Sequence, residues 1–428
     1  MWVAAIALAA CMPDTAGVPP ASDRIFYPTA ASITPDGGYL AVANSNFDLA
    51  YRAGTVVVVD ISKVADELVP GCPEEGCDPV EEAEFLLAGE TVRTGSYAST
   101  LEKAPGGTRM YLTVRGDTTL TTLDFDPAAE TGKRLTCFNP DDPPRSRECS
   151  SDHRVKDGLS ADPYAIGIRR ITYALDGGDV TVDWIFVSHL TSGKITVFEA
   201  EVNPLERDLA PRAVLEDSSF PEGVSAIEYH PLVPSSFYTA TRHADVLYTF
   251  GFASDPQDFD GSTRIVLGPT VGLDAVGDGH DNRDLAFSGD GTMAYVTNRT
   301  PNSLIMIDTS LDEFGYPRND AVGAVELDSG PSLVTVWSPP GSGREWVYAS
   351  CYNSDRVYVI DPEIRAAVDV ILTGNGPHTF VADGEHMLGY LLNFLESTIS
   401  VVDLDPSSAT FNDVRATLGI PEKVRSND

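Results

Sequence analysis

The sequence is short of basic residues. Its 428 residues include 29 Lys and Arg against 64 Asp and Glu, which gives a formal net charge of −35. Nucleic acids and anionic lipid surfaces are bound through basic faces, so this deficit argues against both as partners. We interpret the acidic excess as a solvated surface, with a cationic partner as the alternative.

Long apolar runs are also lacking, since no segment reaches the roughly 20 apolar residues needed to cross a bilayer. The apolar start, MWVAAIALAAC, ends in Leu-Ala-Ala-Cys and is followed by a Pro-rich stretch. This run resembles the end of a bacterial lipoprotein signal. The resemblance implies that Cys11 becomes lipidated and that the protein is exported, facing the periplasm or the cell surface on a lipid anchor. The alternative is an apolar tail with a chance cysteine.

Replacing Cys11 by serine is expected to move the protein from the membrane fraction to the soluble fraction. The apolar segment alone is too short to hold a bilayer, so retention would depend on the acyl group. Detergent partitioning of both forms measures the change. Unchanged membrane retention of Cys11→Ser contradicts lipidation.

Cysteine is scarce, with six residues in the chain, and no CxxCH motif is present, which excludes a covalent c-type haem. Cys72 and Cys77 bracket one insertion, and Cys137 and Cys149 bracket another. We predict a disulfide in each, because closing a long loop restricts the unfolded chain. The alternative is a zinc site, although neither pair has CxxC spacing. Cys351 belongs to neither insertion and is predicted to be a buried free thiol.

The stretch from Asp281 to Asp308 carries the pattern that organises the chain. Leu285–Phe287, Ala294–Thr297 and Leu304–Ile307 are short alternating runs, and Gly, Asp and Asn separate them. Such runs are typical of antiparallel strands joined by tight turns. One sheet of this kind cannot bury both faces, so it needs neighbours.

The same pattern occurs seven times. In five copies, the residue at the Asn298 position precedes the one at the Asp308 position by ten residues. Those pairs are Val114/Asp124, His189/Glu199, Asn298/Asp308, Cys351/Asp361 and Asn393/Asp403. An apolar stretch between copies is predicted to be the fourth, outer strand of a unit: Ala83–Ala88, Ala213–Leu215, Ala324–Leu327, Val368–Leu372 and Arg415–Leu418.

Seven such units predict an all-β, seven-bladed β-propeller of four-stranded antiparallel blades. We assign residues 1–11 to the signal-type segment, 12–23 to a tether, and 24–428 to one propeller with insertions at 63–82 and 127–160. Arg415–Leu418 is expected to close the ring as the last outer strand, with Arg24–Phe26 as the alternative. We expect a monomer.

The Tyr-Val-Thr-Asn of residues 295–298, with Ser-Gly-Asp-Gly before it and Ile-Met-Ile-Asp after it, resembles the YVTN-family β-propeller repeat. The resemblance implies a non-enzymatic binding or scaffold protein of the cell envelope, with an envelope protein or a small anionic ligand as its partner. YVTN-type repeats are also similar to lactonase-type propellers, so a hydrolase at the channel mouth is the alternative. An electron-transfer partner of the quinoprotein type is a third class. Fold alone does not decide among them.

One mouth of a propeller channel is built from residues that start each innermost strand and from the turns between second and third strands. Aligning the copies places Tyr97, Tyr164, Arg283 and His378 in the first set. Arg115, Arg242 and Arg299 fall at one position of the second set. We predict that these seven residues form a cationic mouth for an anionic group. The alternative is that each arginine pairs with a local carboxylate: Asp117, Asp245, Asp281 or Asp284.

No cofactor is predicted. The loop that contains Asp278, His280 and Asp281 has carboxylates and an imidazole that can bind a divalent metal. A Gly-rich turn that satisfies its own backbone is the alternative.

Overall fold

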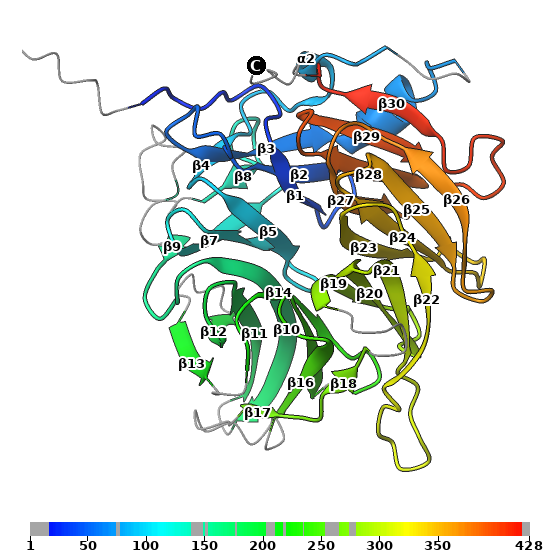
Figure 1. Ribbon diagram of the computed structural model, residues 1–428. Coiled ribbons are helices and arrows are strands. Elements are labelled where there is room, and N and C mark those ends of the chain that lie inside the picture. Colours follow the sequence, from blue (N-terminus) through cyan, green and yellow to red (C-terminus); the bar gives the residue numbers. More distant parts are fainter. Residues whose placement is uncertain are drawn as a thin grey trace, which may run out of the picture.

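The computed structural model describes residues 17–73, 78–137, 149, 153–175, 178–202, 210–216, 220–233, 235–252, 265–273 and 280–421. The strands form seven antiparallel sheets arranged around a central axis, each with its first strand innermost (Figure 1). The predicted seven-bladed β-propeller is therefore confirmed. The described helices are short: α1 (Ile61–Lys63), η1 (Val64–Leu68) and α2 (Glu82–Phe85). None of them is long or apolar enough to cross a membrane.

Among the first four blades, the second and the fourth each carry an additional short strand. The main strands of these four blades are β1 (Pro28–Ile33), β2 (Tyr39–Asn44), β3 (Gly54–Asp60) and β4 (Val92–Thr94); β5 (Ala98–Lys103), β6 (Arg109–Val114), β7 (Thr119–Phe125) and β8 (Leu135–Thr136); β10 (Pro163–Leu175), β11 (Gly178–His189), β12 (Lys194–Glu201) and β13 (Ala210–Glu216); and β14 (Val224–Tyr229), β15 (Ser236–Thr241), β16 (Val246–Phe252) and β17 (Ile265–Leu267). Two short strands, β9 (Arg154–Val155) and β18 (Val271–Gly272), add to β7 and β16.

The last three blades are regular four-stranded units. They are β19 (His280–Phe287), β20 (Met293–Thr300), β21 (Asn302–Asp308) and β22 (Asp320–Glu326); β23 (Pro331–Trp337), β24 (Trp346–Cys351), β25 (Arg356–Asp361) and β26 (Ala366–Leu372); and β27 (Pro377–Asp383), β28 (Leu388–Asn393), β29 (Thr398–Asp403) and β30 (Val414–Leu418). β30 pairs with β29, so the C-terminal strand completes its own blade and the prediction for Arg415–Leu418 is confirmed.

The predicted outer strand of the first blade is wrong. Residues 83–85 of the predicted Ala83–Ala88 strand belong to α2, and the strand that pairs with β3 is β4. The apolar residues Phe85 and Leu86 of this segment still pack against the blade, and Leu86 makes an isolated bridge to Val59. Burial alone therefore produced the apolar pattern that was interpreted as a strand.

The motif asparagines explain why the pattern repeats. Asn44, Asn298 and Asn393 are fully buried at or near the ends of second strands. Their side-chain amides donate to Thr55 Oγ1, to the Pro301 carbonyl, and to Thr398 and Ser400 hydroxyls, respectively. Each asparagine thereby fixes the turn into the third strand, where a buried polar group must find a partner.

The core consists of clusters at the interfaces between blades. Tyr390 and Leu392 of β28, for example, pack with Val42 and Val57 of the first blade. Hydroxyls also join neighbouring blades near the axis: Thr113 donates to the Tyr164 carbonyl, Ser188 to Val224, and Thr297 to Ser332. These bonds fix the inner strand starts, which are the positions that surround the channel.

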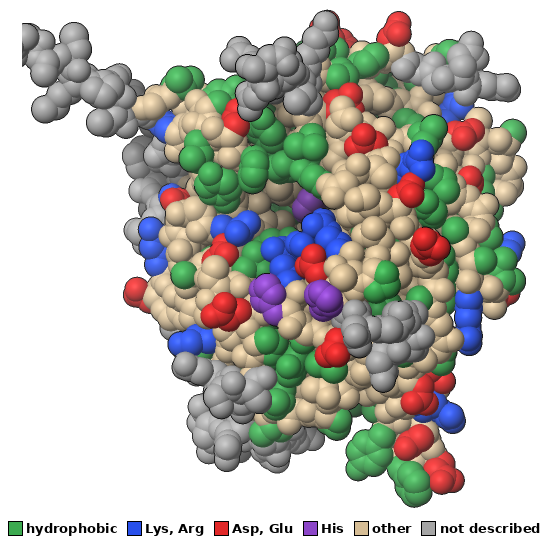
Figure 2. All heavy atoms as spheres, in the orientation of Figure 1, with side chains coloured by type: hydrophobic (Ala, Val, Ile, Leu, Met, Phe, Trp, Pro, Cys, Tyr) green, Lys and Arg blue, Asp and Glu red, His purple; other side chains and the backbone are tan. Residues whose placement is uncertain are grey.

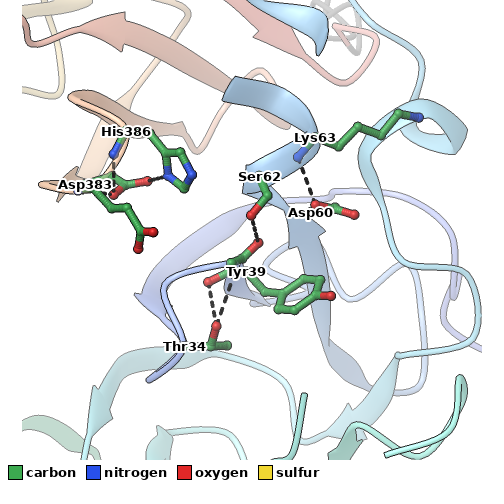
Figure 3. A network of polar contacts seen from close by, with 9 residues as sticks. Thr34, Tyr39, Asp60, Ser62, Lys63, Asp383 and His386 are labelled. Atoms are coloured by element: carbon green, nitrogen blue, oxygen red, sulfur yellow. Dashed lines mark hydrogen bonds and ion pairs between the residues drawn. The ribbon is translucent and has the colours of Figure 1, made fainter. Parts of the chain in front are cut away.

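The seam between the first and last blades is closed by polar contacts and by the first insertion. Thr379 Oγ1 donates to the Thr29 carbonyl at 2.6 Å. Figure 3 shows the turns between first and second strands on the two sides of this seam. Thr34 bonds to the Tyr39 backbone in the first blade, and His386 bonds to Asp383 in the last blade. Val80 adds a parallel bridge to Leu418 on the outer edge of the last blade.

The cysteine predictions have mixed outcomes. Cys137 and Cys149 form a disulfide with Cα atoms 5.0 Å apart, as predicted. Cys351 is a buried free thiol, also as predicted, and burial raises its pKa to about 12. Cys77 lies outside the described residues, so the Cys72–Cys77 disulfide stays a prediction, as does lipidation of Cys11.

Candidate functional site

The cavity at one mouth of the central channel brings together all seven residues predicted for it. Arg115, Arg242, Arg283, Arg299, His378, Tyr97 and Tyr164 line a single cavity of about 460 Å³. In Figure 2, blue side chains gather in a hollow near the centre of the face, with green side chains along one border. These residues come from five different blades and converge at the mouth, as predicted. Their role in binding stays a prediction.

The backbone explains the convergence. In six blades, the amide of the residue after the second strand donates to the carbonyl of a residue that precedes the first strand. These pairs are Ser45–Tyr27, Arg115–Tyr97, Leu190–Asp162, Arg242–Gly223, Tyr352–Gly330 and Phe394–Gly376. The accepting residues have positive φ, between 45° and 88°, which favours the glycines found at three of them. The turn position and the strand start therefore meet at the mouth in every such blade.

The predicted register of Tyr97 is wrong by two residues. Its hydrogen bond to Arg115 and its φ of 61° make Tyr97 equivalent to Asp162 and Gly376, whereas the residue equivalent to Tyr164 and His378 is Ser99. Tyr97 nevertheless lines the mouth. The degraded second repeat gave no signal that distinguished the two registers.

Two of the four mouth arginines are held by carboxylates. Arg115 follows β6, and its guanidinium binds both oxygens of Asp162, with 2.5 Å from Nε to Oδ1. Arg283, in β19, lies 2.7 Å from Asp281 Oδ1 through Nε and donates from Nη2 to Oδ2 at 2.8 Å. Forked pairs of this kind orient the side chain and neutralise its charge. These two arginines therefore serve largely to build the mouth.

The other two arginines have no carboxylate partner among the described residues. Arg242 lies over the Tyr164 ring, 5.1 Å from guanidinium carbon to ring centroid, and its buried Nε makes no hydrogen bond. Arg299 donates from Nε to the Pro331 carbonyl at 2.8 Å. Burial lowers the pKa of both, and the neighbouring Arg283 guanidinium lowers each further. Both positive charges are thus partly buried and form no ion pair among the described residues, and the charge of Asp281, which is bound to Arg283, offsets them only in part.

The carboxylates considered as alternative partners are mostly engaged elsewhere. Asp117 pairs with Arg154, and Asp284 accepts a hydrogen bond from the Val334 amide at 2.9 Å in a deeper part of the channel. Asp245 is exposed and makes no ion pair within the described part of the chain. Of the four proposed partners, Asp281 alone holds a mouth arginine, and the partner of Arg115 is Asp162, which the sequence reasoning missed.

The opposite border of the mouth is aromatic. Phe47, from the turn after β2, contacts Tyr97 with ring centroids 5.9 Å apart and Phe394 at 5.3 Å, both edge-on. Phe394 also lies 6.1 Å from Tyr352, and all four rings line the cavity. Sequence reasoning missed Phe47, because the first repeat carries an insertion after its Asn44 that the alignment skipped.

His378 lies where the mouth meets a second cavity of about 420 Å³ deeper in the channel. Burial, and after it charge repulsion from Arg299 and Arg242, lowers its pKa to about 4, against the opposing effect of a hydrogen bond with the Thr29 backbone. Its Nδ1 lies 3.1 Å from Thr379 Oγ1. At neutral pH, the imidazole is therefore uncharged and adds no positive charge to the mouth.

The deeper cavity carries three carboxylates, from Glu102, Glu228 and Asp284. The side chains of Glu102 and Glu228 are exposed to the channel and that of Asp284 is partly buried, but the channel walls enclose all three. Burial raises the pKa of Glu102 and that of Asp284 to about 7, and the Asp284 charge adds to the shift of Glu102. The pKa of Glu228 is raised well above its usual value, by burial and then by Glu102 and Asp284.

The suggested metal site is only partly described. His280 and Asp281 begin β19, and Asp281 is engaged with Arg283, whereas Asp278 lies outside the described residues. Within the described ranges, no group of three or more His, Cys, Asp or Glu side chains is placed to hold a metal ion.

No protein-family model matches the sequence, and no curated protein matches it. The YVTN likeness thus stays a resemblance of repeat residues. Solved structures with a similar fold include the periplasmic gluconolactonase of Pseudomonas aeruginosa, with a TM-score of 0.55, 16% identity, and coverage of 90% of this chain and 98% of that one. Hydrazine synthase of Kuenenia stuttgartiensis has a TM-score of 0.55, 14% identity, and coverage of 90% and 97%. A dihydro-heme d1 dehydrogenase has a TM-score of 0.50 and 15% identity, with coverage of 94% of this chain and 67% of that one. At these identities, the likeness shows the propeller fold.

Proposed function

We propose that this propeller is a binding protein for a small anionic molecule, which it holds at the channel mouth between Arg242 and Arg299. The observation that carries the proposal is the absence of a carboxylate partner for these two arginines within the described residues. Four guanidinium groups line the cavity and two carboxylates pair with them, so two positive charges remain.

The electrostatics favour an occupant with negative charge. A chain of net charge −35 has many carboxylates with which surface arginines can pair, so two unpaired cations in one hollow depart from the background. Burial and the charge of Arg283 lower the pKa of both, and a bound carboxylate or phosphate would oppose this effect. Guanidinium groups bind such anions through two parallel N–H donors.

Changing both Arg242 and Arg299 to alanine is expected to weaken the binding of acetate and of inorganic phosphate by about 100-fold or more, because each charged hydrogen bond contributes roughly 1.5–3 kcal/mol. Titration calorimetry on the full chain measures the affinities. The midpoint temperature of thermal unfolding should be unchanged or slightly higher, since charge repulsion is relieved.

Arg318→Ala is the matched control, because Arg318 is exposed on the loop between β21 and β22 and does not line the mouth. It should bind both anions like the unmodified chain. Equal affinity of the Arg242/Arg299 variant and the control would overturn the proposal. So would clear destabilisation of that variant, which would indicate a structural role.

A lactonase-type hydrolase at the same mouth is the second candidate, and His378 is the observation that favours it. An uncharged imidazole beside two guanidinium groups can act as a base toward water while the arginines hold an oxyanion. However, a pKa of about 4 makes His378 a weak base at neutral pH, so the geometry supports binding better than catalysis. A hydrolysis assay with aldonolactones separates the two, since a pure binding protein leaves their hydrolysis rate unchanged.

A place in the bacterial cell envelope completes the proposal. The resemblance of the N-terminal run to a lipoprotein signal supports it, and the Cys137–Cys149 disulfide agrees with an oxidising compartment. Cys11 itself lies outside the described residues. The anion site does not depend on this anchoring.

A further inference from the structure

The aromatic border of the mouth is ordered although its central ring is exposed. Phe47 is 54% exposed, and it lies in the turn after β2 next to the buried Asn46. The Asn46 side chain accepts a hydrogen bond from the Tyr51 amide at 3.0 Å and donates to the Tyr51 carbonyl at 2.7 Å and to Ser96 Oγ at 2.9 Å. These bonds hold the turn to itself and to the next blade, so the position of Phe47 is fixed.

The unpaired cations and the aromatic rings occupy different sides of the mouth. Arg242 and Arg299 come from the fourth and fifth blades, whereas Phe47, Tyr97 and Phe394 come from the first, second and last blades. Both groups line the same cavity. An occupant of this cavity therefore meets two cations on one side and an apolar, aromatic wall on the other.

We infer that the ligand class is a flat-ring acid: a molecule in which an aromatic or similarly flat, apolar ring carries one carboxylate or phosphate-type group. This inference rests on the proposed function. The acid group would lie between Arg242 and Arg299, and the ring would pack on Phe47. A rigid aromatic wall adds affinity for flat rings through apolar burial and ring stacking, which a small hydrophilic anion cannot use. The cavity of about 460 Å³ is within the range of small-molecule sites.

Two pairs of probes test this: benzoate against acetate, in which a ring replaces a methyl group, and phenylphosphonate against inorganic phosphate, in which a ring replaces a hydroxyl. Calorimetric titration of the full chain should show that the ring-bearing member of a pair binds at least about tenfold tighter. Phe47→Ala should remove most of this advantage and leave the affinity for acetate and phosphate unchanged. The two pairs also show which acid group is preferred.

Phe314→Ala is the control variant, because Phe314 is 75% exposed but lies on the loop between β21 and β22, outside the mouth. It should bind all four probes like the unmodified chain. Equal affinities within each pair would overturn the inference but not the proposed anion site. So would an equal loss of affinity for ring-bearing and ring-free probes in Phe47→Ala. Failure of all four probes to bind would overturn the proposed function, and the inference with it.

Discussion

Replacing Asp284 by asparagine is expected to stabilise the protein at about pH 8 by about 1–3 kcal/mol and to have little effect near pH 4. Asp284 is partly buried in the deeper cavity of the channel, and its pKa is raised from 3.8 to about 7 by burial, against the opposing effect of hydrogen bonds from the Val334 and Leu285 amides. Asparagine keeps an oxygen acceptor for those amides and removes the charge. Chemical unfolding across this pH range measures the change.

The sign follows from proton binding. Below pH 3.8, the carboxyl is protonated in both states, so it contributes no pH dependence. Between that value and about 7, the folded protein keeps a proton that the unfolded chain has lost, and stability falls as pH rises. Above that window, the stability lost through deprotonation of Asp284 no longer changes with pH. Asp284→Asn should therefore flatten the decline, and removing the charge should also lower the pKa of Glu102 and Glu228.

Glu313→Gln is the matched control for this prediction. Glu313 is exposed on the loop between β21 and β22, and its replacement removes one unit of negative charge from a chain of net charge −35. General relief of charge repulsion would stabilise both variants alike. A gain confined to Asp284→Asn places the effect in the channel, whereas equal gains would show that the enclosure of Asp284 has no energetic consequence.

The sequence predicts the fold well because the repeat is physically redundant. Each blade needs the same buried asparagine or its equivalent, the same tight turns and the same alternation, so seven weak signals support one another. Ala83–Ala88 fails because this segment occurs once, and its apolar residues are needed for packing whether or not they form a strand. Outer strands also face solvent on one side, which weakens their pattern.

The arginine mouth could be predicted because position in the repeat fixes position in space. Arg115 and Arg242 follow equivalent second strands, Arg299 lies near the end of the second strand of its blade, and all three line the mouth. The pairing of these arginines could not be predicted. Asp162 binds Arg115 of the neighbouring blade, and the sequence around neither residue indicates this ion pair. The Phe47 wall was missed for a related reason: an insertion has no counterpart in other repeats, so alignment does not place it.

Arg170→Ala is expected to lower the free energy of unfolding by about 2–4 kcal/mol, because it leaves the Asp183 carboxylate buried without its partner. The two residues lie directly opposite each other on β10 and β11, and the guanidinium donates to both carboxylate oxygens at 2.8 Å. Asp183 is 2% exposed, so water cannot replace the lost bonds. Denaturant unfolding of the variant measures the change.

The burial of Asp183, rather than the loss of an ion pair as such, should determine this effect. Arg356 and Asp328 form an ion pair with side chains 44% and 39% exposed, and Arg356→Ala should cost less than about 1 kcal/mol. Removing both partners of the buried pair, in Arg170→Ala with Asp183→Ala, should recover part of the stability, since no uncompensated charge then remains inside the blade. A double variant as unstable as the sum of its single variants would contradict this account, because the two side chains would then contribute independently.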